Sequence, residues 1–342
     1  MKFATVLPIF NCENYLEDCL ESILNQTYHE FIIYAIDDGS TDKSAAILKR
    51  YAAISKNIIA IYQDNCGVSR TRNKALNLIY SRDDIDYITF LDSDDILDKD
   101  FYLTLNKCLT SHRVDYAVCG LSQFDKTGLI GARGLALPSI LMNQHEILDH
   151  YFTLKGTDEL VPTKFVIPGI HIYRSSAIQN IFFRDDLNAG EDLQFFYDSF
   201  NCLKYGLLIP KILYYYRLRK SSLSHTESGP SIQSLAFYCE FYLENKNIFP
   251  DIVNKSLQDR IINTWWAAVR FFYSDNGQKD PRVKNILDSV YLMIIEIDKE
   301  HHIEKKNKKR LFFYNLGSAF LKLYFWVRTN KNVISNNANY FE

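Results

Sequence analysis

Acidic side chains gather directly after a short apolar run at residues 87–91. The run reads Tyr-Ile-Thr-Phe-Leu, which suits a buried parallel strand, and Asp92, Asp94 and Asp95 follow it. Open α/β sheets bind ligands at the carboxyl ends of such strands. Carboxylate oxygens suit Mg²⁺ or Mn²⁺ held jointly by the protein and a diphosphate. Asp92-Ser93-Asp94 therefore predicts a metal–diphosphate site, and an acidic surface turn is the alternative.

A second pair of acids ends another β-prone run. Residues 36–42 read Ile-Asp-Asp-Gly-Ser-Thr-Asp, in which Gly39 permits a tight turn and Ser40 or Thr41 caps a helix. A turn and a cap explain the glycine and the hydroxyls, but they do not explain paired carboxylates at a strand end. A carboxylate there can accept the N3–H of a uracil ring, and Asp38 is our candidate for that contact.

Together the two acidic sites indicate chemistry on a sugar nucleotide. Nucleotidyl transfer uses similar acids, yet no Gly-rich loop with a lysine follows the first strand. Transfer of a sugar from a nucleotide is therefore the favoured interpretation. A sugar nucleotidyltransferase remains one alternative, and a non-catalytic binding or assembly subunit with the same fold is another.

These sites need a sheet to position them. Up to about residue 123, β-prone runs alternate with helical periodicity, which is typical of a Rossmann-like, mainly parallel sheet flanked by helices. We expect strands at 3–7, 31–36, 58–62, 87–91 and 116–119, and helices at 15–24, 40–51 and 68–78. The periodicity is poor from 124 to 186, where we expect loops that build a second wall. A helix at 192–203 and a strand or hairpin at 207–217 complete this part.

The character of the chain changes after Pro230. Strand signals disappear, and three or four helices are expected, including 257–273, 283–297 and 310–327. We therefore divide the chain into a catalytic domain at 1–229 and a helical appendage at 230–342. The catalytic domain would comprise a nucleotide-binding half at 1–123 and an acceptor-side half at 124–229.

Composition fits a cytoplasmic globular enzyme. The 342 residues are 47% hydrophobic with a formal net charge of -2, so no general basic field favours a nucleic-acid partner. The 7 cysteines include no Cys-x-x-Cys pair, and we expect reduced thiols rather than a zinc cluster or disulfide framework. The amino terminus lacks a signal-peptide pattern, and no apolar run reaches the roughly 20 residues that span a bilayer.

Several short motifs occur in a characteristic order. They are Leu7-Pro8-Ile9-Phe10-Asn11, Asn25-Gln26-Thr27-Tyr28, Asp37-Asp38-Gly39-Ser40-Thr41-Asp42, Asn65-Cys66-Gly67-Val68-Ser69, Arg72-Asn73 and Asp92-Ser93-Asp94-Asp95. In type and order they resemble the signatures of bacterial family 2 glycosyltransferases of GT-A fold. The resemblance implies an inverting transfer from a UDP-sugar with Mn²⁺ or Mg²⁺ as cofactor.

The resemblance also implies which residues bind the donor. Asp94 would ligate the metal, while Asp92 would support the ribose or a metal-bound water. The remaining nucleotide contacts would come from Pro8, Ile9, Phe10, Asp38, Asn65, Gly67, Ser93 and either Arg70 or Arg72.

The base of such a reaction is carried over from the same resemblance. The family places a Glu-Asp pair at the start of a helix, and Glu191-Asp192 matches it. Without the resemblance, acids in a first helical turn are ordinarily partners of the helix dipole. With it, Asp192 would remove the proton of the acceptor hydroxyl as that oxygen attacks the anomeric carbon opposite UDP. Glu191 would orient the acceptor or Asp192, and the metal would neutralise the departing diphosphate.

A downstream loop, residues 216–225, resembles the family's Arg-to-Ser loop. Arg217 and Ser222 would donate hydrogen bonds to diphosphate oxygens. A histidine in a polar loop is more often solvated, and completion of the metal shell by His225 is the alternative. The chain departs from the pattern at His171, where relatives commonly carry a lysine, so contacts with the sugar or acceptor there are open.

The end of the chain combines charge with aromatic residues. Lys305, Lys306, Lys308, Lys309 and Arg310 precede an aromatic-rich run at 311–326. Packing or oligomerisation through these helices is the favoured interpretation, and peripheral contact with an anionic membrane leaflet, where a lipid-linked acceptor would be found, is the alternative. The expected reaction is transfer of a hexose or N-acetylhexosamine to a hydroxyl of a bacterial capsule, lipopolysaccharide or protein-linked glycan.

Overall fold

The chain forms two compact units, residues 1–219 and 220–342. The computed structural model describes residues 1–125, 128–130, 138–144, 146–147, 168–186, 190–219, 232–247, 251–273, 281–301, 303 and 305–315. The domain boundary predicted at residue 229 lies outside these ranges, so that division stays a prediction. Each unit is described by itself.

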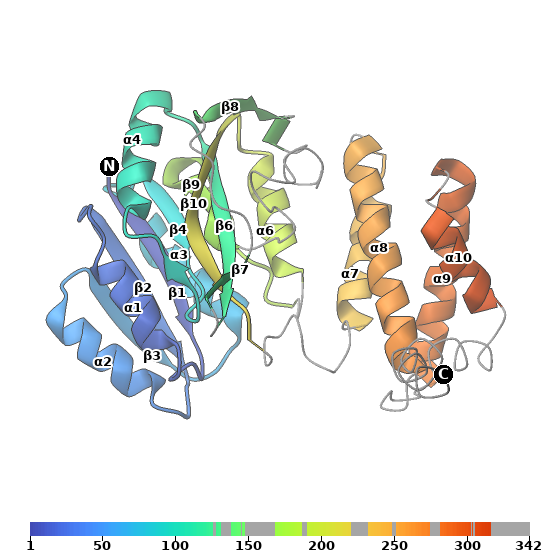
Figure 1. The fold of residues 1–342 in the computed structure, drawn as a ribbon, viewed down its shortest axis with the longest axis horizontal. Coiled ribbons are helices and arrows are strands. Elements are labelled where there is room, and N and C mark those ends of the chain that lie inside the picture. Colours follow the sequence, from blue (N-terminus) through green and yellow to red (C-terminus); the bar gives the residue numbers. More distant parts are fainter. Residues whose placement is uncertain are drawn as a thin grey trace, which may run out of the picture. The chain divides into compact units, whose positions relative to one another are not determined.

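The first half of unit 1 is a parallel sheet with helices on both faces. Its strands are β1 (Phe3–Ile9), β2 (Phe31–Asp38), β3 (Ile58–Gln63) and β4 (Tyr87–Phe90), in the spatial order β3-β2-β1-β4. Its helices are α1 (Leu16–Leu24), α2 (Ser44–Ile54) and α3 (Val68–Tyr80). Helices α1 and α2 cover one face and α3 covers the other (Figure 1). The predicted strands and helices of this half are confirmed.

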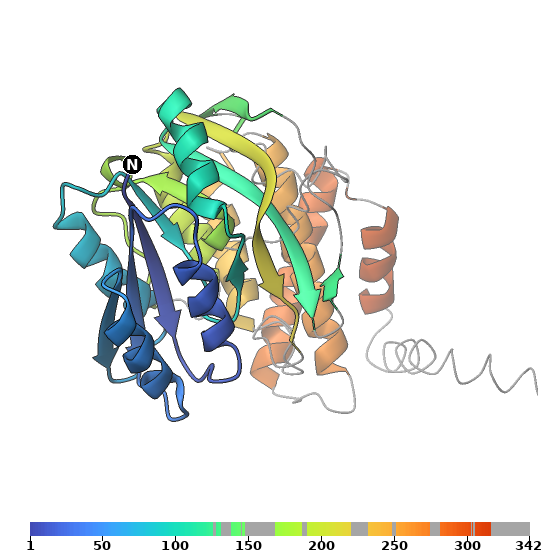
Figure 2. The ribbon, with the colours of Figure 1, turned by 60° about the vertical axis from the view of Figure 1, so that its left-hand side comes forward.

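The second half of unit 1 extends the sheet with mixed directions. It contains β5 (Ile96–Leu97), α4 (Phe101–His112), β6 (Tyr116–Asp125), β7 (Gly128–Ile130), β8 (Ile140–Asn143), η1 (Pro168–Ile170), β9 (His171–Arg174), η2 (Ser175–Ala177), α6 (Glu191–Phe200) and β10 (Tyr205–Arg217). Strand β9 enters between β4 and β6 and runs antiparallel to both. The long strands β6 and β10 run parallel, and Figure 2 shows them side by side in green and yellow.

The prediction of loops alone between 124 and 186 is wrong for the described residues there. Strands β7, β8 and β9 lie in this stretch, and β6 continues into it. Strand β9 has 4 residues and its first three are buried, so it is too short to produce an alternating pattern. Just before it, a Cβ at Gly169 would lie 2.1 Å from the ring of Tyr214, so only glycine fits beneath that tyrosine.

The strand register places the acidic motifs at one edge of the sheet. Ile9 of β1 pairs with Asp37 of β2, and the amide of Leu91 donates to the carbonyl of Val6 just after β4. Parallel strands that end together bring the residues after them together. The acids of β2 and those after β4 therefore flank the end of β1.

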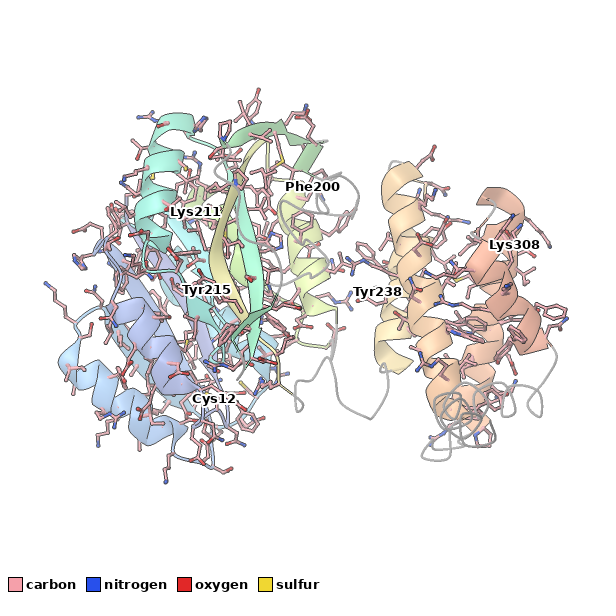
Figure 3. All side chains as sticks on the ribbon, viewed as in Figure 1. Cys12, Phe200, Lys211, Tyr215, Tyr238 and Lys308 are labelled. Atoms are coloured by element: carbon pink, nitrogen blue, oxygen red, sulfur yellow. The ribbon has the colours of Figure 1, made fainter. Side chains whose placement is uncertain are left out.

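Unit 2 is helical in its described part. Its helices are α7 (Ile232–Asn245), α8 (Asp251–Phe272), α9 (Pro281–His301) and α10 (Lys305–Asn315). Trp265 is fully buried, contacts the rings of Tyr291 and Tyr314, and donates its Nε1–H to the carbonyl of Leu287. Figure 3 shows side chains between the helices of this unit and labels Lys308 on α10.

The predicted helices of unit 2 are largely confirmed. The helix predicted at 257–273 matches α8 except for residue 273, which follows the end of α8. The helix predicted at 283–297 lies within α9. The helix predicted at 310–327 begins earlier, at Lys305, and its residues after Asn315 lie outside the described ranges. Among the helices that the structure describes, none combines the length and apolarity needed to cross a membrane.

Candidate active site

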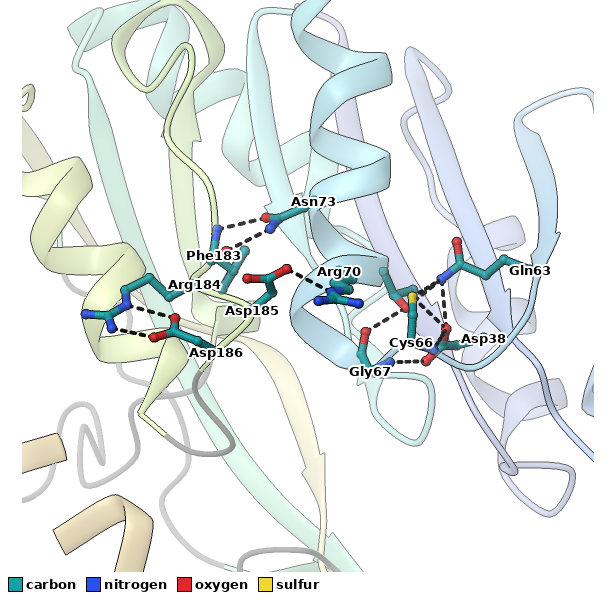
Figure 4. Close-up of polar contacts among 11 residues, drawn as sticks. Asp38, Gln63, Cys66, Gly67, Arg70, Asn73, Phe183, Arg184, Asp185 and Asp186 are labelled. Carbon is teal, nitrogen blue, oxygen red and sulfur yellow. Dashed lines mark hydrogen bonds and ion pairs between the residues drawn. The ribbon is translucent and has the colours of Figure 1, made fainter. Parts of the chain in front are cut away.

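Asp38 organises the loop that joins β3 to α3. Its Oδ1 accepts hydrogen bonds from the side chain of Gln63 at 2.7 Å and the amide of Cys66 at 3.0 Å, and its Oδ2 accepts from the amide of Gly67 at 2.9 Å (Figure 4). Burial raises the pKa of Asp38, but these hydrogen bonds outweigh it and hold the pKa below its ordinary value. Asp38 is thus an ionised anchor of the loop, and its contact with a uracil N3–H stays a prediction.

Asn65 and Gly67 belong to the same loop. The Asn65 side-chain amide donates to the carbonyl of Asp38 at 3.1 Å. Gly67 adopts a φ of 92°, which only glycine adopts without strain, and it immediately precedes α3. The predicted nucleotide residues Asp38, Asn65 and Gly67 are therefore brought together.

Arg72 on α3 joins the acids after β4 to those at the start of α6. Its Nη2 donates to Oδ1 of Asp92 at 3.1 Å, and its Nη1 donates to Oδ1 of Asp192 at 2.9 Å and to Oε1 of Glu191 at 3.3 Å. The Arg72 side chain is only 4% exposed. Three residues predicted for two different parts of the site, Asp92, Glu191 and Asp192, therefore share one guanidinium.

Burial and charge set the protonation equilibria of this cluster. Burial raises the pKa of Asp192 well above its ordinary value, and the positive charge of Arg72 opposes that rise. Burial lowers the pKa of Arg72, but the carboxylates of Asp192, Asp92 and Glu191 outweigh it and raise the pKa, so the guanidinium stays charged. A carboxylate with an elevated pKa is suited to general-base catalysis near neutral pH.

Strand β10 supports the acid loop, residues 92–95, through hydrogen bonds to Asp95. Asp95 is fully buried, and it accepts hydrogen bonds from the hydroxyl of Tyr214 at 2.6 Å and from the amide of Arg217 at 2.8 Å. Asp94 forms an ion pair with Arg219 at 2.5 Å. Burial and the neighbouring charge of Asp92 raise the pKa of Asp94, while Arg219 opposes this. The three acids of the loop therefore have different partners.

Arg217 is engaged within the protein in this structure. Its Nε donates to the carbonyl of Asp94 at 2.7 Å and its Nη2 donates to Asp18 at 2.9 Å, while its guanidinium lies over the rings of Tyr15 and Phe124. These contacts hold the acid loop and leave few donors for the predicted diphosphate contact. Sequence reasoning missed Arg219, whose charge reaches Asp94 itself.

A divalent cation has suitable donors in this loop. Asp92 and Asp94 present carboxylate oxygens, which Mg²⁺ and Mn²⁺ prefer. In the part of the chain that is described, no cluster of three or more His, Cys, Asp or Glu side chains is arranged to hold a metal. The pair therefore fits an ion that completes its shell with diphosphate oxygens and water rather than a cage built by protein alone.

The other predicted site residues have different positions and partners. Pro8 and Ile9 end β1, and Phe10 follows with its side chain 49% exposed. Ser93 lies between the two acids in the sequence. Arg70 points to Asp185, with which it forms an exposed ion pair at 2.8 Å, and it does not join the Arg72 cluster (Figure 4).

The sequence also singled out Ser222, His225 and His171. Ser222 and His225 lie outside the described ranges, so their predicted contacts stay predictions. His171 is buried in β9, and its Nδ1 lies 2.5 Å from the hydroxyl of Tyr116. It borders a small pocket between the sheet and α6, to which Asp192 also contributes.

A comparison with known protein families decides the family of this chain. The sequence profile described as "Glycosyl transferase family 2" matches residues 5–182, more than half of the 342 residues. The chain belongs to glycosyl transferase family 2. The match covers the ends of β1, β2 and β4 and Arg72 of α3, and it ends before the Glu191–Asp192 pair.

Curated relatives extend the similarity. "Glycosyltransferase GlyA" of Streptococcus pneumoniae is 30% identical over 223 residues, which are 65% of this chain and 31% of GlyA. "Minor teichoic acid biosynthesis protein GgaB" of Bacillus subtilis is 24% identical over 330 residues, which are 92% of this chain and 34% of GgaB. The chain thus spans about a third of the length of each of these proteins.

A solved structure shares the fold. S. aureus TarS 1-349, crystallised in complex with UDP-GlcNAc, superposes with a TM-score of 0.68 at 19% identity, covering 97% of this chain and 92% of TarS 1-349. The likeness confirms the predicted GT-A type fold, with a mixed sheet, flanking helices and carboxyl-terminal helices.

Proposed function

We propose that this protein is an inverting, metal-dependent glycosyltransferase that moves a hexose or N-acetylhexosamine from a UDP-sugar to a hydroxyl of a bacterial surface glycan. The single observation that carries the proposal is the Arg72 cluster, in which Asp92 of the acid loop and Asp192 of α6 bond one guanidinium. This cluster places the acid loop, which would hold the leaving diphosphate, next to the partly buried carboxylate of Asp192, which is suited to act as a base.

In the proposed reaction each group of the site has one task. The loop around Asp38 receives the uridine, and the acid loop with Arg219 receives the diphosphate. Asp192 accepts the proton of the acceptor hydroxyl. At the same time the hydroxyl oxygen forms a bond to the anomeric carbon, and the bond between that carbon and the UDP oxygen breaks. A divalent ion, when bound, supplies positive charge to the diphosphate.

The donor and the acceptor class are supported by the relatives. TarS 1-349 was crystallised with UDP-GlcNAc, which supports a UDP-sugar donor here. GgaB is named for minor teichoic acid biosynthesis, and its similarity extends over 92% of this chain, which supports a cell-surface polymer as the product. The acceptor is lipid-linked or protein-linked.

The test is incubation with a panel of UDP-sugars with and without Mn²⁺ or Mg²⁺. We expect release of UDP from one sugar, and Asp192→Asn should reduce turnover by a factor of about 10² to 10⁴ while UDP still binds. Release of pyrophosphate from a nucleoside triphosphate would instead indicate a nucleotidyltransferase. UDP binding without turnover of any sugar would indicate a non-catalytic subunit.

The metal has a test of its own. Asp94→Ala should abolish the dependence of UDP affinity on Mn²⁺ in calorimetry, because it removes a carboxylate ligand. Unchanged Mn²⁺-dependent affinity would rule out the role proposed for Asp94.

We further propose that α10 makes peripheral contact with an anionic membrane surface. Its inner face is formed by Asn307, Leu311 and Tyr314, which are buried. Its outer face carries four exposed lysines and Phe312, whose side chain is 61% exposed. Each lysine contributes about 1 kcal/mol near an anionic leaflet, and an exposed aromatic ring can enter the headgroup region. Association with a second copy of the chain remains the alternative.

A further inference from the structure

We infer that Arg72 is a positioning residue, which holds the carboxylate of Asp192 in place for proton transfer, and not a residue that binds the nucleotide. The inference rests on the proposed function, since it concerns the base of that reaction. It reassigns a side chain whose motif suggested contact with the donor.

The first argument is the geometry of the guanidinium. Nη1 donates to Oδ1 of Asp192 at 2.9 Å, while Nη2 donates to Oδ1 of Asp92 at 3.1 Å. The planar fork of an arginine fixes the directions of its N–H groups, which the single charge of a lysine does not. Bonding through Oδ1 leaves Oδ2 of Asp192 for the acceptor hydroxyl.

The second argument is that Arg72 is enclosed. Its side chain is 4% exposed, and the ring of Phe183 covers the guanidinium, with 5.1 Å between the Cζ atom and the ring centroid. Phe183 in turn stacks on Phe195 of α6, with centroids 4.1 Å apart and an interplanar angle of 7°. Carboxylates and an aromatic ring thus surround the guanidinium, where a diphosphate would have to displace them.

The third argument comes from the next residue of α3. The side chain of Asn73 accepts a hydrogen bond from the amide of Phe183 at 2.8 Å and donates one to its carbonyl at 2.7 Å (Figure 4). Consecutive side chains of α3 therefore fix both the Phe183 backbone and the carboxylates at the start of α6. Helix α3 is the rigid element from which the base is placed.

The guanidinium of Arg72 therefore links the two sides of the site. Its Nη2 bonds the acid loop, which would hold the leaving group, and its Nη1 bonds the base. A base must lie within about 3 Å of the oxygen whose proton it abstracts, and a displacement of about 1 Å can reduce the rate 100-fold. A substitution that keeps the charge but loses the fork should therefore affect turnover more than donor binding.

The deciding variant is Arg72→Lys, compared with Arg50→Lys, which changes an exposed arginine of α2 paired with Glu17. We expect the kcat of Arg72→Lys to fall about 100-fold, with the donor KM and the UDP Kd within about threefold of wild type. Arg50→Lys should leave all three unchanged. A donor KM that rises while kcat is kept would overturn the inference and assign Arg72 to the nucleotide.

Two further measurements separate positioning from a purely structural role. In an Asp192→Asn background, Arg72→Lys should cause no additional loss of residual UDP-sugar hydrolysis, because it acts through Asp192; an additive loss contradicts the inference. Phe183→Leu removes the ring from the guanidinium without changing a charge. Phe183→Leu should lower kcat several-fold at unchanged UDP affinity, and an unchanged kcat contradicts the inference. This variant replaces Arg72→Lys as the test if Arg72→Lys does not fold.

Failure of the inference can be told from failure of the proposed function. If the wild-type protein releases UDP from a sugar nucleotide but Arg72→Lys changes only KM, the inference alone is wrong. If the wild-type protein turns over no sugar nucleotide, the proposed function is wrong and the inference fails with it.

Discussion

Single residues were predictable where their type and position in the sequence carried the signal. Asp92 and Asp94 are predicted because they follow an apolar run, whereas Asp192 is predicted only through the resemblance of Glu191-Asp192 to the family's pair. The structure shows that Asp92 and Asp192 bond one guanidinium, and their roles in the reaction stay predictions. Arg217 and Arg219 were not distinguishable, because they stand two residues apart in one basic stretch. Only the fold shows that Arg217 bonds Asp18 and the acid-loop backbone, whereas Arg219 pairs with the carboxylate of Asp94.

The pH dependence of turnover follows from the burial of Asp192. Burial raises its pKa above the ordinary value of about 3.9, and protonation of a base abolishes its activity. The kcat/KM for transfer should therefore fall tenfold per unit on the acidic side of a pKa clearly above 3.9, and it should rise to a plateau as the pH increases. Initial rates of UDP release between about pH 4 and 9 give the curve. An acidic limb at or below 3.9 would contradict the assignment.

Arg217 and Arg219 should differ in what their removal changes. Arg219→Ala removes a charged donor near the diphosphate site and should weaken UDP binding by about 1.5–3 kcal/mol with little change in Tm. Arg217→Ala breaks contacts within the acid loop and should lower Tm. Calorimetric UDP titration and thermal melting of both variants make the comparison. The reverse pattern would restore the diphosphate role to Arg217.

At the level of elements, the parallel half of the sheet was predictable and the inserted strand was not. Strands β1 to β4 are apolar runs separated by amphipathic helices, so each run predicts a strand. Strand β9 can be identified only from its pairing with β4 and β6, and both of these strands lie about 50 or more residues earlier in the chain. Local sequence does not contain those pairings.

Tyr214 tests how β10 supports the acid loop. Tyr214→Phe removes the hydroxyl that bonds buried Asp95, and we expect a loss of about 1–3 kcal/mol in the free energy of unfolding. The control is Tyr215→Phe, because the neighbouring hydroxyl makes only a 3.4 Å contact with Asp98. That change should stay within about 0.5 kcal/mol. Denaturant unfolding of both variants is the measurement, and equal losses would contradict the role of Tyr214.

At the scale of the whole molecule, sequence patterns predicted a GT-A type unit and further helices, and the fold comparison bears this out. The role of the carboxyl-terminal helices was not predictable, because a basic amphipathic helix suits a membrane, a polymer or a second subunit equally well. Exposure now identifies which lysines and which phenylalanine lie on the outer face of α10.

Vesicle binding tests that face. The full chain should float with vesicles rich in anionic lipid and not with neutral ones, and salt should weaken the binding. Changing Lys305, Lys306 and Lys309 to Glu should abolish flotation, whereas Lys299→Glu on α9, at an exposed position, should not. Sedimentation provides the second readout. A dimer that the triple variant dissociates, with no binding of wild type to anionic vesicles, would favour association between copies.

The pairing of Asp95 with Tyr214 has a consequence for how the protein is made. The two residues are separated by 119 positions, and β5, which directly follows Asp95, pairs with β10 in the described part of the chain. Ribosomes add about 5–20 residues per second, so the acid loop emerges several seconds or more before the strand that supports it. During that interval the parallel half of the sheet can form around β1, while Asp95 still lacks its partners Tyr214 and Arg217. We therefore expect the parallel half of the sheet to form before the acid loop gains its support from β10.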